Sequence, residues 1–291
     1  MFLVTFSRLG LQRILGIIWF IDGILQLKPQ MFTQAFVSQV ILPVAQSQPG
    51  WIAHSVNWAA SIISPHIAAY NAVFAGIQLL IGLGLILNVK VKVTLLLSFV
   101  WAIIVWWFSE GFGQVLTGQA LLLTGAPGAV LLYGLAGWVV WPSERNSQKS
   151  DSISNKGRKF ASYSLGLIWI LGSILQLQPA YLAAKGLSGA FSVDWIGNLV
   201  GTHGMEVSVI LAVVELAIGL AFLFGKNVRP FIWASLILSL FFWWAGESFG
   251  QMLSSLGTDP NSGPLIILLT LCAYPNLLTL KPAKRIKEVS V

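Results

Sequence analysis

The feature that most constrains this chain is a series of eight long apolar segments. Only 9% of its 291 residues are charged and 56% are hydrophobic, whereas a soluble domain carries about 25% charged residues. A helix needs about 20 apolar residues to cross a hydrocarbon core, and the segments lack the alternation typical of membrane strands. The sequence therefore predicts an all-α, polytopic membrane protein with eight transmembrane helices. They span roughly residues 9–27, 67–87, 93–108, 126–141, 160–177, 207–224, 230–245 and 264–280.

Basic residues concentrate on one side of this predicted topology. Fifteen of the 17 lysines and arginines lie there, and only Lys28 and Lys185 fall on the other side. Because cytoplasmic loops are enriched in Lys and Arg, we expect a multi-pass protein of the cell membrane with both termini in the cytoplasm. The net charge of +7 then faces the anionic headgroups of the lipid bilayer, and nucleic acid is not the expected partner.

The first part of the chain recurs in the second. "LGIIWFIDGILQLKP" (15–29) matches "LGLIWILGSILQLQP" (165–179) at nine of fifteen positions, with an offset of 150. Further along the offset is 137, as in "IQLLIGL" (77–83) and "VELAIGL" (214–220). Self-similarity of this kind indicates a duplicated structural unit.

We therefore expect two four-helix membrane repeats, residues 1–145 and 158–291, joined by a basic cytoplasmic linker at 146–157. Four helices is an even number, so both repeats insert with the same orientation, as parallel repeats about an axis along the membrane normal. In the first outer loop, apolar residues recur at helical spacing over 31–44, which is typical of a helix lying in the interface. The segment 51–63 is a second interfacial candidate.

The units have a family likeness. Each begins with a short "LG..W....LQL.P" helix, followed by a longer outer loop and an apolar second helix with "GL" steps. This arrangement resembles the DoxX/DoxD-like membrane proteins. The resemblance implies a membrane component of thiosulfate- or quinone-coupled oxidation, with a membrane or extracytoplasmic redox partner. The tandem fusion departs from the single-unit pattern, and no catalytic motif carries over.

Each repeat brings one histidine and one glutamate to its outer face. "WWFSEGFGQ" (106–114) and "WWAGESFGQ" (243–251) match at six of nine positions. If the repeats face each other, these side chains converge, and two imidazoles with two carboxylates would suit a divalent metal. The same groups would alternatively bind a quinone and shuttle its protons. The candidate ligand-binding residues are His66, Glu110, Gln114, His203, Glu247 and Gln251, and the metal candidates are His66, Glu110, His203 and Glu247. A structural alternative is that each glutamate accepts hydrogen bonds from backbone amides of the glycine-rich turn after it.

Two acids lie deeper, within apolar segments. Asp22 has Gly172 at the equivalent position, and Glu215 has Gln78. Ionisable groups inside a membrane are costly and usually face a cavity or another helix. Asp22, Glu215 and Gln78 are therefore candidates for a proton or cation path, or for hydrogen bonds between helices.

Three functions remain open from the sequence. The first is a membrane component of an electron-transfer or sulfur/quinone oxidoreductase system that binds a small ligand or quinone near the outer face. The second is a transporter of a small solute or cation that uses the intramembrane acids. The third is a non-catalytic scaffold subunit, and the sequence does not decide whether the protein is an enzyme. The single cysteine, Cys272, excludes an internal disulfide.

Overall fold

The computed structural model describes residues 5–142 and 151–277, and within them every regular element is helical. This confirms the all-α prediction. A helix overlaps each of the eight apolar segments. These are α1 (Arg8–Leu25), α4 (Ile67–Ile86), α5 (Val91–Phe108), α6 (Ala129–Val139), α7 (Asn155–Gln176), α9 (Gly204–Phe224), α10 (Arg229–Ala245) and α11 (Ser262–Ala273).

Three stretches of the described chain are long and apolar enough to cross a membrane. They are Gly50–Ile86, Val91–Phe108 and Gly204–Phe224. Two helices are shorter than expected, since α6 has 11 residues and α11 has 12. At α6 the reason is local: Gly128, the N-cap residue, has φ of 103°, so the chain turns there and the helix starts only at Ala129. At α11 the expected segment ran to residue 280, and residues 278–280 lie outside the described part.

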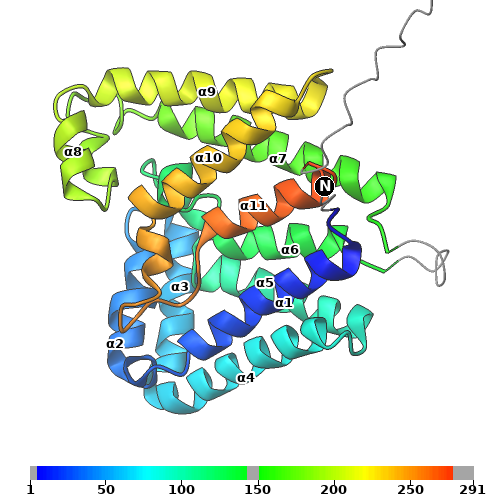
Figure 1. Ribbon diagram of the computed structural model, residues 1–291. Coiled ribbons are helices and arrows are strands. Elements are labelled where there is room, and N and C mark those ends of the chain that lie inside the picture. The colour runs from blue at the N-terminus through cyan, green and yellow to red at the C-terminus, as the bar shows by residue number, and fades with distance from the viewer. Residues whose placement is uncertain (1–4, 143–150, 278–291) are drawn as a thin grey trace, which may run out of the picture.

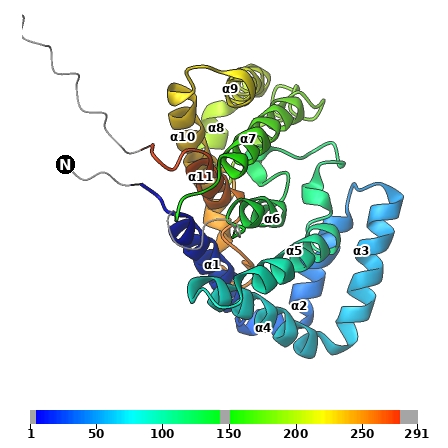
Figure 2. The ribbon, with the colours of Figure 1, turned by 90° about the vertical axis from the view of Figure 1, so that its right-hand side faces the viewer.

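The helices form two bundles, shown in Figures 1 and 2. In the first bundle α1 packs on α4 and α5 on α6, and in the second α7 packs on α9 and α10 on α11. The bundles meet where α11 contacts α6 and α7. In Figure 1 the N-terminal end of α1 lies at the right of the molecule, whereas α2, α3 and α8 lie at the left. We call the left-hand end, which holds the connections expected outside the cell, the outer end.

The outer connections contain short helices. The expected helix at 31–44 is broken into η1 (Pro29–Phe32), α2 (Gln34–Phe36), η2 (Val37–Ile41) and η3 (Leu42–Ala45). The segment 51–63 is helical, as α3 (Gly50–Ile63), and α8 (Asp194–Val200) lies in the second bundle's outer connection. Of the linker expected at 146–157, residues 146–150 lie outside the described part, and α7 already begins at Asn155.

Two outer loops reach from one bundle to the other. Leu123, in the loop between α5 and α6, packs its backbone against Gly246 at the end of α10. The loop between α10 and α11 reaches the first bundle. Its carbonyl oxygens accept hydrogen bonds there from Lys28, which lies just after α1. The acceptors belong to Met252, Ser254 and Gly257, at 2.8, 2.6 and 3.1 Å. Each bundle is thus completed by a loop of the other, and this exchange builds the site described next.

Candidate functional site

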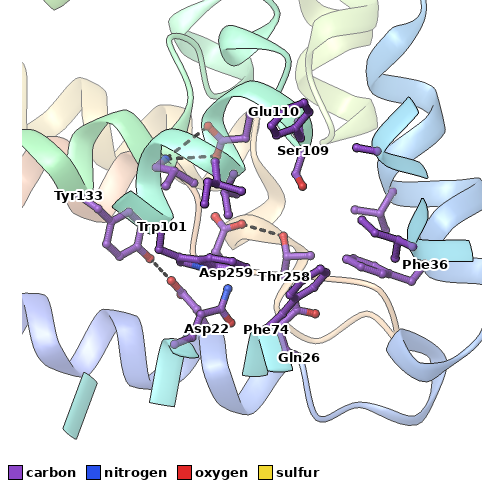
Figure 3. Close-up of a pocket in the computed structure, with 18 of the residues that line it drawn as sticks. Asp22, Gln26, Phe36, Phe74, Trp101, Ser109, Glu110, Tyr133, Thr258 and Asp259 are labelled. Carbon is purple, nitrogen blue, oxygen red and sulfur yellow. Dashed lines mark hydrogen bonds between the residues drawn. The ribbon is translucent and has the colours of Figure 1, made fainter. Parts of the chain in front are cut away.

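An aromatic cavity of about 270 Å³ lies in the first bundle near its outer end (Figure 3). We call it the inner cavity. Its walls include the rings of Trp19, Phe74 and Trp101, from α1, α4 and α5. All but two of its lining residues belong to the first bundle and its outer connections. The exceptions are Thr258 and Asp259, from the loop between α10 and α11.

Several buried polar atoms in the wall of the inner cavity have no hydrogen-bond partner. Asp22 accepts a short hydrogen bond from the Tyr133 hydroxyl through Oδ2, while its Oδ1 is unpaired. The Oε1 atoms of Gln26 and Gln78 and the Nε1 of Trp101 are also unpaired. All four side chains are at most 8% exposed. A buried polar atom without a partner costs about 1–3 kcal/mol, so four of them among the residues of one cavity wall are a costly arrangement.

Glu110 holds the start of α6. Both of its carboxylate oxygens accept from the backbone amide of Val130, at 3.2 and 3.4 Å. Gly128 permits this approach, because a Cβ there would lie 2.3 Å from Glu110 Oε2. Burial, followed by the nearby charge of Asp259, raises the pKa of Glu110 to about 8.

Glu247 makes the equivalent contacts in the second bundle. It accepts a short hydrogen bond from the Ser262 hydroxyl, and one from the Gly263 amide at 3.2 Å. Burial raises the pKa of Glu247 to about 8 as well. Both glutamates therefore accept hydrogen bonds from backbone amides, as the structural alternative proposed. However, the amides belong to the helix that follows, 16 or 20 residues away, rather than to the adjacent turn.

The glycine-rich turns have an unusual backbone. Every residue of 111–114 and of 248–251 has a positive φ, including Phe112 at 58° and Phe249 at 56°. A left-handed turn costs roughly 1–2 kcal/mol for each residue other than glycine, yet the chain forms it twice. The second turn supports the loop that enters the inner cavity, because a Cβ at Gly250 would lie 2.4 Å from the Asp259 carbonyl oxygen.

Asp259 is the central acid of the site, and the sequence analysis missed it. Its Oδ2 accepts from the Thr258 hydroxyl and its Oδ1 from the Asn261 amide, both at 2.7 Å. Burial raises its pKa. The stretch "TDPNSGP" reads as an ordinary turn. The available signal was an acidic residue at the outer end of a chain that has only 10 acids.

The proposed metal ligands are not brought together. His66 and His203 are both exposed, at the starts of α4 and α9, and neither lines a cavity described here. Within residues 5–142 and 151–277, no three His, Cys, Asp or Glu side chains form a group able to hold a metal ion. The physical reason is that both glutamates turn inward to the next helix while both imidazoles face outward.

The remaining candidates separate by bundle. Gln78 lines the inner cavity together with Asp22. Glu215 lies in the second bundle, fully buried beside Leu122. Gln114 donates to the Val44 carbonyl at 3.1 Å, and Gln251 is exposed. Asp22 and Glu215 thus do not line one path among the cavities described.

Comparison of the chain with family models, with curated proteins and with solved structures gave no match.

Proposed function

We propose that this chain is a multi-pass integral membrane protein. The eight helices that overlap the apolar segments would cross the bilayer, four in each bundle, as parallel repeats. The apolar side chains exposed on the outward faces of α4, α5, α9 and α10 support this arrangement. They include Leu80, Leu96, Ile103, Ile210, Val213, Ile237 and Leu240. Soluble proteins rarely expose contiguous apolar surface on this scale. With the basic end in the cytoplasm, the inner cavity lies toward the outside.

The short central helices fit this proposal. An 11-residue helix is only about 16 Å long, too short for a core of roughly 30 Å. The missing length of α6 and α11 is made up by the loops that precede them, which carry buried residues such as Leu121, Leu122 and Leu123. Irregular backbone is tolerated at membrane depth where protein buries it or where it lines a cavity.

We further propose that the inner cavity binds the ring of a quinone-class molecule in its reduced, hydroquinone form. The observation that carries this is the set of unpaired wall atoms, of which three are acceptors (on Asp22, Gln26 and Gln78) and one is a donor (on Trp101). A hydroquinone supplies hydroxyl donors for the acceptors and a flat ring for the aromatic walls. A volume of about 270 Å³ lies just below the range for drug-sized ligands, which suits a single substituted ring.

In this function the chain serves as a membrane component of an electron-transfer system, as the DoxX-like resemblance implies. Cys272 is buried in α11, and the chain has no second cysteine with which to form a redox-active dithiol. Electrons from a bound hydroquinone would therefore pass to a redox partner at the outer face.

Binding of a short-chain hydroquinone to the purified protein in detergent tests the proposal. Three tryptophans line the inner cavity, Trp19, Trp58 and Trp101, so we expect saturable quenching of tryptophan fluorescence. Asp22→Asn should weaken binding at least about tenfold. Glu215→Gln, in the other bundle, serves as the matched control and should leave the affinity unchanged. Equal affinity in Asp22→Asn and the unaltered protein, or no saturable quenching, would overturn the proposal.

A second candidate is transport of a small organic cation. The inner cavity is lined by three carboxylic acids, Asp22, Glu110 and Asp259, and no Lys, Arg or His of the described part of the chain lines it. Acids and aromatic rings together attract ammonium groups. Uptake of a labelled organic cation into proteoliposomes, abolished by Asp22→Asn, would favour this function over hydroquinone binding.

A further inference from the structure

Two acids separate the inner cavity from a second, polar cavity of about 500 Å³ at the outer end. We call the second one the outer cavity. Polar side chains from the outer loops line it, among them Gln46, Gln114, Thr117 and Asn261. Glu110 and Asp259 line both cavities. They therefore stand at the boundary between an aromatic chamber and a hydrophilic one.

The three acids of the inner cavity are arranged in sequence. In Figure 3 Asp259 lies between Asp22, which comes from α1, and Glu110, which follows α5. Asp22 is 2% exposed, whereas Glu110 and Asp259 are half-buried. The acids thus lead from the buried Tyr133–Asp22 hydrogen bond toward the outer cavity.

No basic side chain interrupts this series. The titratable groups that line the two cavities are Asp22, Glu110, Tyr133 and Asp259. Glu247 joins Asp259 in lining a third, smaller cavity of about 170 Å³. Among the described residues no Lys, Arg or His lines any of the three cavities. Lys28 bonds to the same loop, but its hydrogen bonds go to the carbonyl oxygens of Met252, Ser254 and Gly257. Burial raises the pKa of Glu110 to about 8, so this group can gain and lose a proton near neutral pH, and burial also raises the pKa of Asp259.

We propose that Glu110 and Asp259 form a proton exit from the inner cavity to the outer cavity. This inference rests on the proposed binding of a hydroquinone. When the hydroquinone is oxidised, both hydroxyl O–H bonds break and the ring becomes the quinone. The two electrons pass one at a time to two molecules of a one-electron acceptor protein at the outer face, and the two protons pass by way of Asp259 and Glu110 to the outer cavity.

The exit is distinct from the structural role of Glu110 at α6. Glu110→Gln keeps a carbonyl oxygen that accepts from the Val130 amide, but it cannot relay a proton. Asp259→Asn likewise keeps an acceptor for the Asn261 amide. The double variant therefore keeps an acceptor for each of the two backbone amides while removing both acids, and the Thr258 hydroxyl, which donates to Asp259, can instead accept from the introduced amide.

The test measures proton release directly. Protein preloaded with a short-chain hydroquinone is mixed with ferricyanide, a one-electron oxidant, in weak buffer that contains a pH dye. In the unaltered protein we expect two protons for each hydroquinone, released as fast as ferricyanide is reduced. In the Glu110→Gln, Asp259→Asn double variant, proton release should slow at least about tenfold when the hydroquinone concentration is high enough to saturate tryptophan quenching in that variant. Glu110→Asp in the Asp259→Asn background should recover part of the rate, and Glu206→Gln, on the exposed start of α9, should change nothing.

The two proposals fail separately in this design. If the unaltered protein shows no saturable quenching, hydroquinone binding is wrong. If binding is intact and the double variant releases protons at the rate of the unaltered protein, only the exit is wrong.

Discussion

The two bundles share a framework but differ in what fills them. In the first, Trp19 donates through Nε1 to the Ser98 hydroxyl at 3.0 Å, and in the second Trp169 donates to Ser235 at the same distance. The glutamate contacts at the starts of α6 and α11 also correspond. The repeated sequence features thus coincide with repeated contacts that hold helices and loops together.

The interiors differ at positions 22 and 172, which are equivalent in the sequence repeat. Asp22 faces the inner cavity of the first bundle, whereas the second bundle has Gly172 at this place. A Cβ on Gly172 would lie 1.9 Å from Leu122 Cδ1, because the loop of the first bundle inserts Leu122 there. The corresponding loop of the second bundle presents Asp259 to the first. The second bundle is thus filled at this position by an apolar side chain, whereas the first keeps a cavity lined with acids. We therefore expect the proposed ligand to bind in the first bundle.

The largest expected effect is that of Leu122→Ala, which tests whether Leu122 fills the interior of the second bundle. Leu122 is completely buried, and removing a buried leucine side chain costs about 2–5 kcal/mol. The free energy of unfolding, measured by denaturant titration in mixed micelles, should fall by that amount, while hydroquinone affinity of the first bundle stays unchanged. Leu116→Ala is the control, since Leu116 is 52% exposed and should cost less than about 0.5 kcal/mol. A cost for Leu122→Ala as small as that of the control would mean that Leu122 does not fill the second bundle.

A second comparison concerns the response to pH. The pKa of Glu247 rises from 4.5 to about 8 on folding because of burial. Between these values the folded chain binds more protons than the unfolded chain, so stability falls as pH increases from about 4.5 to about 8 and levels off above it. In Glu247→Gln this part of the decline should vanish, and the Tm in detergent between pH 5 and pH 9 should vary less. Glu110→Gln should flatten the Tm profile similarly. Of these two variants, only Glu110→Gln should slow proton release. A Tm profile of Glu247→Gln as steep as that of the unaltered protein would contradict the burial of this acid.

The sequence was sufficient for the framework and insufficient for the cavity. Apolar runs predicted the positions of the long helices, because burial and helix length leave few alternatives for such runs. The repeats also pointed to Glu110 and Glu247, whose contacts do correspond. However, each glutamate was predicted to lie beside a histidine, because the two repeats were expected to face each other symmetrically. The cavity in the structure is asymmetric. Asp259 reaches the first bundle only because a loop crosses between bundles, and a contact over more than 200 residues leaves no local pattern to detect.

The smallest expected effect is that of replacing the equivalent tryptophans Trp19 and Trp169, which compares the two bundles directly. Trp19→Phe and Trp169→Phe each remove one buried hydrogen bond, worth about 1 kcal/mol, and leave a serine hydroxyl without its donor. The two variants should therefore lose similar stability in the same micelle titration. Of these two tryptophans, only Trp19 lines the inner cavity, where its ring also packs on Tyr133 with centroids 4.2 Å apart. Trp19→Phe should thus weaken hydroquinone binding several-fold, and Trp169→Phe should leave it unchanged. If both variants weakened binding equally, the ligand would depend on the two bundles alike, and the assignment of the site to the first bundle would be wrong.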